Sequence, residues 1–244
     1  MRVATFNIRN GRGLDGWNSW PFRRRRLVDQ IAALGVDVIG LQEVFSFQQR
    51  YLRRRLPGHD FVSRARGRRF GERIPVVYNT STMRLLRAST RWFSEHPDRP
   101  GSKLPNATFA RVATLVEFEE ISSGRRFGVA NLHLDARVDS NRTRSITMLC
   151  EWLDRSVDWI VLGDFNAEDG DPELQLLLAE GFESLLDDSA GGTNHGFERH
   201  RDGKRIDHIF VRGEFHIDES HVEADCEAPA TSDHWPVVAD LHMR

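Results

Sequence analysis

The feature that most constrains this chain is a series of short apolar segments that end abruptly in polar side chains. An apolar run of five or six residues is typical of a buried β-strand. Because loops converge outside the strand ends of an α/β sheet, side chains placed there can form one shared crevice. Carboxylate, amide or imidazole side chains end such runs at six places: Phe6-Asn7, Leu41-Gln42-Glu43, Asn131-Leu-His133-Leu-Asp135, Gly163-Asp164-Phe-Asn166, Arg205-Ile-Asp207-His208 and Ser232-Asp233-His234.

Helical and strand-like patterns alternate along the chain. Strands outnumber helices, and helices occur in both halves, which predicts a layered α/β fold whose sheets are covered by helices. We expect residues 1–244 to form a single catalytic domain. Helices are predicted over residues 21–34, 47–56, 140–156 and 172–180. Strands are predicted over residues 2–8, 36–41, 60–64, 74–79, 84–93, 108–118, 127–134, 158–162, 205–212, 215–222 and 235–242.

The net charge of −2 hides a strong asymmetry between the two halves. Residues 1–118 carry 22 basic and 9 acidic side chains (+13), whereas residues 119–244 carry 12 and 27 (−15). Nearly all of the positive charge is arginine, because Lys103 and Lys204 are the only lysines. The rigid donor fork of arginine suits phosphate oxygens, although a GC-rich genome would produce the same bias.

Few signals concern the compartment or the assembly of the protein. Cys150 and Cys226 lack the spacing of a metal site, and we expect them to be free thiols. The chain starts with a strand-like run rather than a secretory leader, and no apolar run approaches the ~18 residues of a membrane span. We therefore expect a cytoplasmic monomer without a membrane span and without an obligate protein partner.

Each polar strand ending also has an ordinary explanation. A glutamate after a strand is commonly solvated, Asp164-Phe-Asn166 can form a turn or a helix cap, and His133 can be a hydrogen-bonded core histidine. Asp233-His234 could simply start an edge strand. A shared site at the strand ends would be absent only if every one of these ordinary explanations were true at the same time. Glutamate, aspartate and asparagine oxygens fit Mg²⁺ or Mn²⁺ better than a zinc site.

In their order along the chain, these motifs resemble the endonuclease/exonuclease/phosphatase superfamily. That superfamily includes deoxyribonucleases, abasic-site endonucleases, poly(A) deadenylases, inositol-polyphosphate phosphatases and neutral sphingomyelinases. The resemblance implies a four-layer αββα sandwich of two mainly antiparallel or mixed sheets flanked by helices, with a divalent-metal site at one edge. A bacterial branch of unsettled substrate is more similar, since it shares the motifs at Asp15–Arg23 and Trp92–Ser102, but this chain departs from it at Leu104-Pro-Asn-Ala107.

The resemblance assigns a metal and a water-activating group to residues of this chain. Glu43 would be the principal ligand of Mg²⁺ or Mn²⁺, with Asp233 contributing to the metal shell and Asn7 holding either the metal shell or a phosphate oxygen. Asp164 would orient or deprotonate the attacking water, and Asn166 would stabilise the transition state. These roles meet a physical need, because an anionic phosphate ester repels hydroxide unless a cation and an oriented water are supplied.

The resemblance also assigns the acid, base and phosphate contacts. His234, oriented by Asp207, would act as a general base or polarise the phosphate. His133 would bind the phosphate or protonate the leaving oxygen. Arg111 and Asn131 would contact the substrate phosphate.

These roles together predict a divalent-metal-dependent hydrolase of phosphate esters. The preferred substrate is nucleic acid or nucleotides, DNA and RNA included, because the basic first half could attract a phosphate backbone. The alternative is a phosphosugar, an inositol phosphate or a sphingomyelin-like head group, since one metal site serves many esters. A silent binding module is disfavoured, because a dead scaffold has no physical need for a complete set of acid, base and ligands.

Weaker signals lie outside these motifs. Arg23 could bind phosphate, and Arg64–Arg69 could follow a nucleic-acid backbone. The loop Thr193-Asn194-His195 could touch substrate. His208 is expected to be structural, because it points to the opposite face of its strand from Asp207.

Overall fold

The computed structural model describes residues 1–68, 70–187 and 189–243, which build two six-stranded sheets, four α-helices and one 3-10 turn. The first sheet has the order β11-β12-β1-β2-β4-β3 and contains β1 (Arg2–Asn7), β2 (Val38–Gln42), β3 (His59–Val62), β4 (Val76–Asn79), β11 (Phe215–Val222) and β12 (Val237–Met243). The second sheet has the order β5-β6-β7-β8-β10-β9 and contains β5 (Met83–Trp92), β6 (Val112–Glu120), β7 (Arg126–His133), β8 (Trp159–Asp164), β9 (Glu183–Ser184) and β10 (Asp207–Arg212). The helical elements are η1 (Gly16–Asn18), α1 (Trp20–Ala33), α2 (Ser46–Arg53), α3 (Asp139–Trp152) and α4 (Pro172–Ala179).

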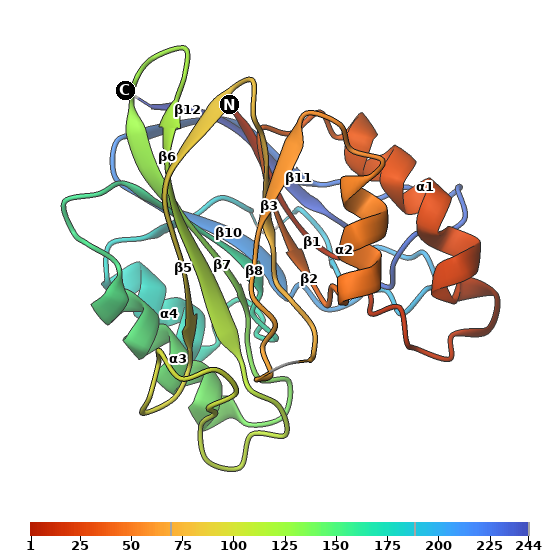
Figure 1. Cartoon of the computed structure of the whole chain (residues 1–244), viewed down its shortest axis with the longest axis horizontal. Coiled ribbons are helices and arrows are strands. Elements are labelled where there is room, and N and C mark those ends of the chain that lie inside the picture. The colour runs from red at the N-terminus through yellow and green to blue at the C-terminus, as the bar shows by residue number, and fades with distance from the viewer. Residues whose placement is uncertain (69, 188, 244) are drawn as a thin grey trace.

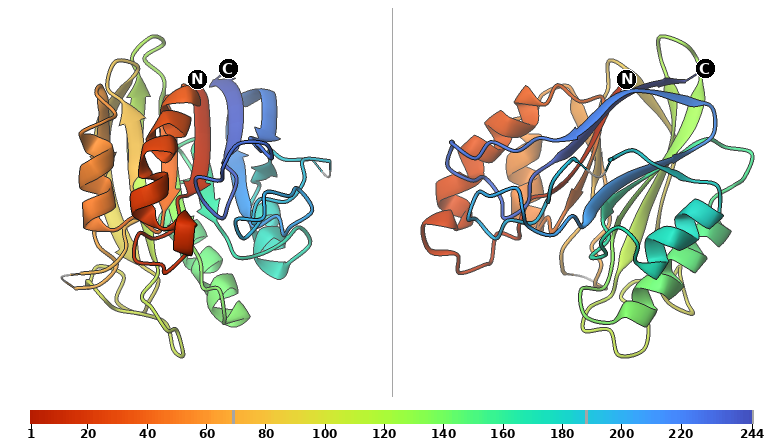
Figure 2. Two further views of the ribbon diagram at one scale, coloured as in Figure 1. Left: turned by 90° about the vertical axis from the view of Figure 1, so that its right-hand side faces the viewer. Right: turned by 180° about the vertical axis from the view of Figure 1, so that it is seen from behind.

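The two sheets pack face to face, and each outer face is covered by two helices (Figures 1 and 2). Val38 of the first sheet and Leu162 of the second belong to the fully buried core between the sheets. On the outer face of the first sheet, Leu41 packs in the cluster that contains α1 and α2. On the outer face of the second sheet, Val161 packs in the cluster that contains α3 and α4. The four-layer αββα sandwich is therefore confirmed.

Each sheet contains one parallel pair of strands, and these pairs create the shared edge. β1 and β2 are joined through α1, and β7 and β8 are joined through α3. Parallel strands need such a crossover, and both strands then end at the same edge of the sheet. Asn7 therefore lies beside Gln42, and His133 lies beside Asp164. The antiparallel β10 starts at this edge with Asp207 opposite Asp164.

Most predicted elements are present with shifted boundaries. β8 runs to Asp164, two residues beyond the predicted end, because its ladder with β10 continues that far. α3 ends at Trp152 instead of residue 156, since the backbone turns extended at Leu153 (φ −83°, ψ 115°). The sequence does not predict β9 and η1, because two or three residues carry no periodicity. Cys150 and Cys226 are free thiols, as predicted. Within the described residues, no helix has the length and apolar character needed to cross a membrane.

At Gly40, in β2, the packing of the two sheets leaves no room for a side chain. A Cβ atom there would lie 2.1 Å from Leu162 Cδ1 and 2.8 Å from the side chain of Asn131, both in the second sheet. Gly40→Ala is therefore expected to destabilise the fold by about 1–3 kcal/mol, the usual cost of overpacking a dense core. Urea denaturation of the two proteins measures this difference, and equal midpoints would contradict it.

Candidate active site and metal centre

Asp164, the last residue of β8, is the buried centre of the candidate active site. Its Oδ2 accepts a hydrogen bond from Asn7 Nδ2 at 2.9 Å and lies 3.4 Å from His133 Nε2. Its Oδ1 accepts a hydrogen bond from the backbone N–H of Asn166 at 3.0 Å. Burial and the nearby charge of Asp207 raise the pKa of Asp164 to about 7. The ends of β1, β7 and β8 thus meet at one carboxylate.

Asp207 and His234 form a buried pair beside Asp164. His234 Nδ1 lies 2.7 Å from Asp207 Oδ2, which fixes the orientation of the imidazole ring. Burial lowers the pKa of His234, but the surrounding carboxylates, led by Asp207, outweigh it and raise the pKa to about 10. A protonated His234 ring can donate a hydrogen bond to a phosphate oxygen.

Glu43 follows β2 in a left-handed backbone conformation (φ 61°), and Asn166 follows β8 in the same conformation (φ 50°). Non-glycine residues adopt this conformation rarely, and they cluster at functional sites. Asn10 donates two hydrogen bonds to Glu43 Oε2, from its backbone N–H at 2.8 Å and from Nδ2 at 3.0 Å. Burial raises the pKa of Glu43, but these hydrogen bonds outweigh it and keep the pKa below its usual value. The carboxylate is therefore held in its charged form.

The oxygen atoms at this edge fit a hard divalent cation. Asp164, Asp207 and His234 offer ligand atoms within 4.8 Å of one another. Within the described part of the chain, Asp207 Oδ1 is buried without a hydrogen-bond partner. Burial also raises the pKa of Asp233. A cation would neutralise these charges and satisfy the unpaired oxygen. The Asp164 and Asp207 carboxylates could hold it, and the ligand roles of Glu43 and Asp233 stay predictions.

Asn7 is buried, and both ends of its amide are bonded within the chain. Nδ2 donates to Asp164, and Oδ1 accepts a hydrogen bond from the backbone N–H of Arg9 at 3.0 Å. Asn7 therefore positions Asp164, and its role as a metal ligand stays a prediction. The side chain of Arg9 also reaches Asp233, with 3.4 Å between Nη1 and Oδ2.

Arg111 and His133 line a narrow hollow together with Arg66 and Glu72. Arg66 forms an ion pair with Glu72 at 2.7 Å. Burial, reinforced by the charge of Arg111, lowers the pKa of His133 well below its usual value. His133 is therefore neutral, so it can donate a hydrogen bond to a leaving oxygen but holds no readily released proton.

The predicted contact between Asn131 and the substrate phosphate is wrong. The side chain is fully buried between the sheets. It donates to the backbone carbonyls of Leu41 at 3.1 Å and Pro75 at 2.9 Å, and it accepts a hydrogen bond from Gln42 Nε2 at 2.7 Å. Asn131 lies two residues before His133 on β7, so its side chain is on the same face of the strand but farther from the sheet edge. Its amide links the two sheets.

The predicted phosphate contact of Arg23 is also wrong. Its side chain is fully buried in α1, and burial lowers its pKa to about 10. The guanidinium is still charged at neutral pH, and it binds the two loops that carry Asn10 and Asp233. It donates hydrogen bonds of 2.7–2.9 Å to the backbone carbonyls of Ile8, Arg9, Asn18 and Thr231.

The loop that contains Thr193 and Asn194 supports the buried histidine pair. Thr193 Oγ1 accepts hydrogen bonds from the backbone N–H groups of Ile206 and Asp207, each at 3.1 Å. Asn194 Nδ2 lies 3.0 Å from His234 Nε2. The sequence predicts a substrate contact for this loop, and the structure places Asn194 against the nitrogen of His234 that faces away from Asp207.

Sequence reasoning misses Asn10 and Gln48. Gln48, in α2, accepts a hydrogen bond from the backbone N–H of Gly11 at 2.9 Å and so fixes the loop of Asn10. Neither residue ends an apolar run, and an Asn-Gly loop after a strand was the one available signal. His208 is buried and lies 3.0 Å from the carbonyl oxygen of Ala167, which agrees with the structural role predicted for it.

Comparison with known proteins decides the family. A family model described as the Endonuclease/Exonuclease/phosphatase family matches residues 4–234. The chain belongs to this family. It is therefore a phosphoesterase with a phosphate-ester substrate, and members of the family typically use a divalent metal.

Several individual proteins are similar to this family member over much of its length. One solved structure is a mannosyl-6-phosphatase of Bacteroides thetaiotaomicron, with 27% sequence identity, a TM-score of 0.93 and 100% of each chain covered. Another is the TDP2 protein of D. rerio complexed with a single strand DNA product, with 17% identity, a TM-score of 0.76 and coverage of 100% of this chain and 99% of that one. That similarity concerns the fold alone. Protein L388 of Acanthamoeba polyphaga mimivirus is 29% identical in an alignment of 184 residues that covers 69% of this chain and 68% of L388.

Removal of the His234 imidazole should lower kcat by ~10²-fold or more, because a positioned acid or base contributes about that much. Asp207→Asn should also lower kcat, since the ring loses its charged orienting partner. Steady-state hydrolysis of a phosphate ester by each variant measures kcat, and thermal unfolding of His234→Ala shows whether that variant is folded. His59→Ala is the matched control, because His59 is a histidine on β3 whose ring bonds only the nearby carbonyl of Pro57 among the described contacts. A fully active His234→Ala protein would refute the assignment.

Proposed function

We propose that this chain is a divalent-metal-dependent phosphatase that releases phosphate from a phosphorylated sugar. The similarity to the mannosyl-6-phosphatase carries this proposal, because it extends over the full length of both chains at a TM-score of 0.93. The similarity to the DNA-bound protein supports a shared fold only. This order reverses the preference drawn from the sequence, which places nucleic acid first and small phosphate esters second.

A cavity beside the catalytic residues supports a sugar-bearing substrate of some size. Its volume is about 1250 Å³, and Arg66 lines both this cavity and the hollow that contains His133 and Arg111. Pockets for small ligands usually measure roughly 300–1000 Å³. The larger volume suits a phosphorylated sugar that is one unit of a larger molecule.

The lining of this cavity is cationic and aromatic. Its aromatic residues are Phe45, Phe70 and Phe109, and the exposed Phe70 ring can pack against the C–H face of a sugar, whereas Arg12 and Arg66 already cover one face of Phe45 and Phe109. Arginine and lysine side chains can donate hydrogen bonds to hydroxyl and phosphate oxygens. Of the predicted basic segment Arg64–Arg69, Arg69 lies outside the described residues. The described cationic lining residues are Arg12, Arg66, Arg68, Arg99 and Lys103.

The side chains of the site can divide the steps of hydrolysis between them. A bound divalent cation would neutralise the phosphate oxygens. Asp164, held by Asn7, would orient the water and take its proton as the new O–P bond forms. His234, held by Asp207, would donate a hydrogen bond to a phosphate oxygen. As the P–O bond to the sugar breaks, the leaving oxygen would accept a hydrogen bond from His133 and a proton from water.

Purified protein with Mg²⁺ should release inorganic phosphate from mannose 6-phosphate faster than it cleaves DNA or RNA. EDTA should abolish the release, because the clustered carboxylates need a cation to bind an anionic ester. Glu43→Ala should abolish the Mg²⁺-dependent release of phosphate, because the variant lacks the predicted principal ligand of the cation. A phosphate-release assay and a gel assay on plasmid DNA, single-stranded DNA and RNA, run on the same preparations, measure both activities.

The Asp164→Asn protein controls for contaminating enzymes in these assays. Nucleic acid that is cut by the wild type and spared by Asp164→Asn, without phosphate release from any sugar phosphate, would overturn the proposed substrate. Inositol phosphates and sphingomyelin in the same panel test the other small esters. Inactivity on every ester would overturn the proposed function itself.

Removal of cationic side chains from the cavity should weaken substrate binding more than turnover. Arg68 and Arg99 are exposed, so each alanine substitution should raise KM by ~5-fold with kcat nearly unchanged, as expected for uniform binding at a solvent-exposed charge. Arg87→Ala is the matched control, because Arg87 is an exposed arginine on β5 outside this cavity. Steady-state kinetics on a phosphorylated sugar measure both constants. Unchanged KM values would place the sugar elsewhere.

A further inference from the structure

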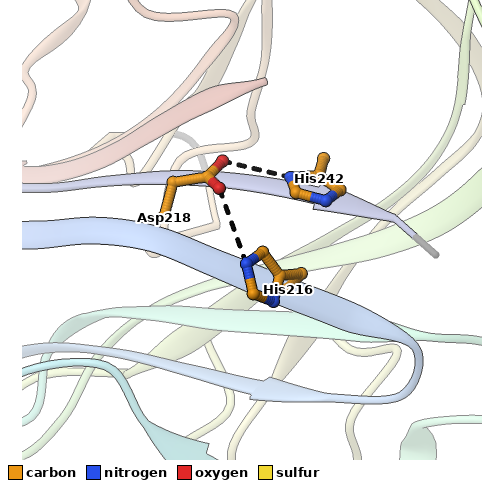
Figure 3. Close-up of side chains that lie close together, drawn as sticks. All are labelled: His216, Asp218 and His242. Atoms are coloured by element: carbon orange, nitrogen blue, oxygen red, sulfur yellow. Dashed lines mark hydrogen bonds and ion pairs between the residues drawn. The ribbon is translucent and has the colours of Figure 1, made fainter.

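Three candidate metal ligands lie together on the hairpin of β11 and β12 (Figure 3). His216 and Asp218 belong to β11, and His242 belongs to β12. Each imidazole turns a nitrogen toward the carboxylate (Figure 3). His242 Nδ1 lies 3.1 Å from Asp218 Oδ2, and His216 Nε2 lies 3.8 Å from Asp218 Oδ1. The potential ligand atoms of the three side chains therefore point toward one another.

Strand pairing and a β-bulge bring these side chains to one face. His216 lies directly opposite His242 in the antiparallel register, and their ring centroids are 4.8 Å apart. The register shifts between Ile217 and Glu219, so Asp218 is an extra residue without a partner of its own in the ladder. A bulge of this kind re-aims the side chain that it carries. Here the backbone places the Asp218 carboxylate between two imidazoles, and paired strands keep it there.

We propose that His216, Asp218 and His242 form a second metal site, for a first-row transition cation such as Zn²⁺. Zn²⁺ binds imidazole nitrogens together with carboxylate oxygen, whereas Mg²⁺ prefers oxygen ligands alone. The three ligand atoms lie within 4.8 Å of one another, so small side-chain rotations bring them onto one ion. The side chains are 47%, 51% and 57% exposed, which gives a cation direct access from solvent.

The hairpin site is separate from the catalytic centre in position and in chemistry. His242 lies near the C-terminal end of β12, whereas His234 precedes the N-terminal end of the same strand. The extended chain between them spans roughly 25 Å. The catalytic ligands are buried and mostly oxygen atoms, while the hairpin ligands are exposed and mostly nitrogen atoms. The second site is therefore independent of the proposed phosphatase activity.

A cation at this site would join an edge strand to the rest of the sheet. β11 is at the edge of the first sheet and pairs with β12, which pairs in turn with β1. A metal ion bound by both strands would restrain the opening of β11, because it would add ligand bonds across the pair. The expected effect concerns the stability of the hairpin and leaves turnover unchanged.

Isothermal titration with Zn²⁺, in the presence of excess Mg²⁺, tests this site by comparison of variants. The wild type should bind one more equivalent of Zn²⁺ than the double variant His216→Ala/His242→Ala. Any Zn²⁺ bound at the catalytic site is the same in both proteins and does not affect this difference. Asp218→Asn should weaken the binding of that equivalent by ~10-fold or more, since even the outer partners of metal ligands contribute that much. The double variant His59→Ala/His96→Ala removes two histidines outside the cluster and should keep the equivalent. Equal Zn²⁺ stoichiometry in the wild type and in His216→Ala/His242→Ala would overturn the proposal.

Hydrogen exchange locates the bound ion independently. Zn²⁺ should slow the exchange of β11 backbone amides in the wild type and have no such effect in His216→Ala/His242→Ala. Circular dichroism of each variant shows that the comparison is made on folded protein, and Asp218→Asn, which keeps the shape of the side chain, provides the test if the double variant does not fold. Unchanged exchange of β11 despite a bound equivalent would place the ion elsewhere and reject the hairpin site.

Discussion

Buried negative charge at the shared edge of the two sheets is the constraint on which the active site depends. Asp164 and Asp207 lie directly opposite each other on neighbouring antiparallel strands, and both are almost inaccessible to water. Two carboxylates in this position repel each other and lose their hydration, which destabilises the folded state unless other groups compensate. A protonated His234 would supply one positive charge, and a bound cation would supply the rest.

Most of the groups that position the loops at this edge do not neutralise the negative charge of its carboxylates. Arg23 is a buried cation, yet among the described residues its hydrogen bonds go to four backbone carbonyls and none goes to a carboxylate. It can therefore fix the loops of Asn10 and Asp233 while the acidic side chains remain available to a metal. Gln48 fixes the first of these loops through an uncharged amide. Arg9 is the exception, because it contacts Asp233 directly and would compete with a cation for that carboxylate.

The sequence predicted that the candidate site residues would lie at one sheet edge, because strand geometry converts a position in the chain into a place in space. A residue at the end of an apolar run lies at the edge of its sheet, whatever connects it to the next strand, so Asn7, Glu43 and Asp164 could be assigned in advance. The same argument failed at Asn131, since the polar residue before His133 lies one step inside the edge. For Arg23 the sequence left a phosphate contact open, because a run of arginines in a helix does not show which one points inward.

Sequence patterns could not predict the irregular backbone of the structure. The bulge at Asp218 and the left-handed conformation of Glu43 depend on long-range pairing, and neither changes the alternation of apolar residues that a sequence displays. The contact of Asn194 with His234 likewise joins a loop to a residue 40 positions away. Such features are set by tertiary contacts, which explains why the positions of the ligands were predicted better than the groups that hold them.

Chemistry and specificity belong to different parts of this fold. The candidate catalytic side chains lie on or next to strand ends, where the two ladders fix them, whereas the large cavity is lined by loop residues such as Arg68, Arg99 and Phe109. Loops tolerate changes that would disrupt a sheet, so one catalytic edge can serve different phosphate esters. Catalytic motifs could therefore identify the reaction without identifying the substrate. The departure from the bacterial branch at residues 104–107 falls between two cavity-lining segments, so under the proposed function it would alter the part of the molecule that contacts the substrate.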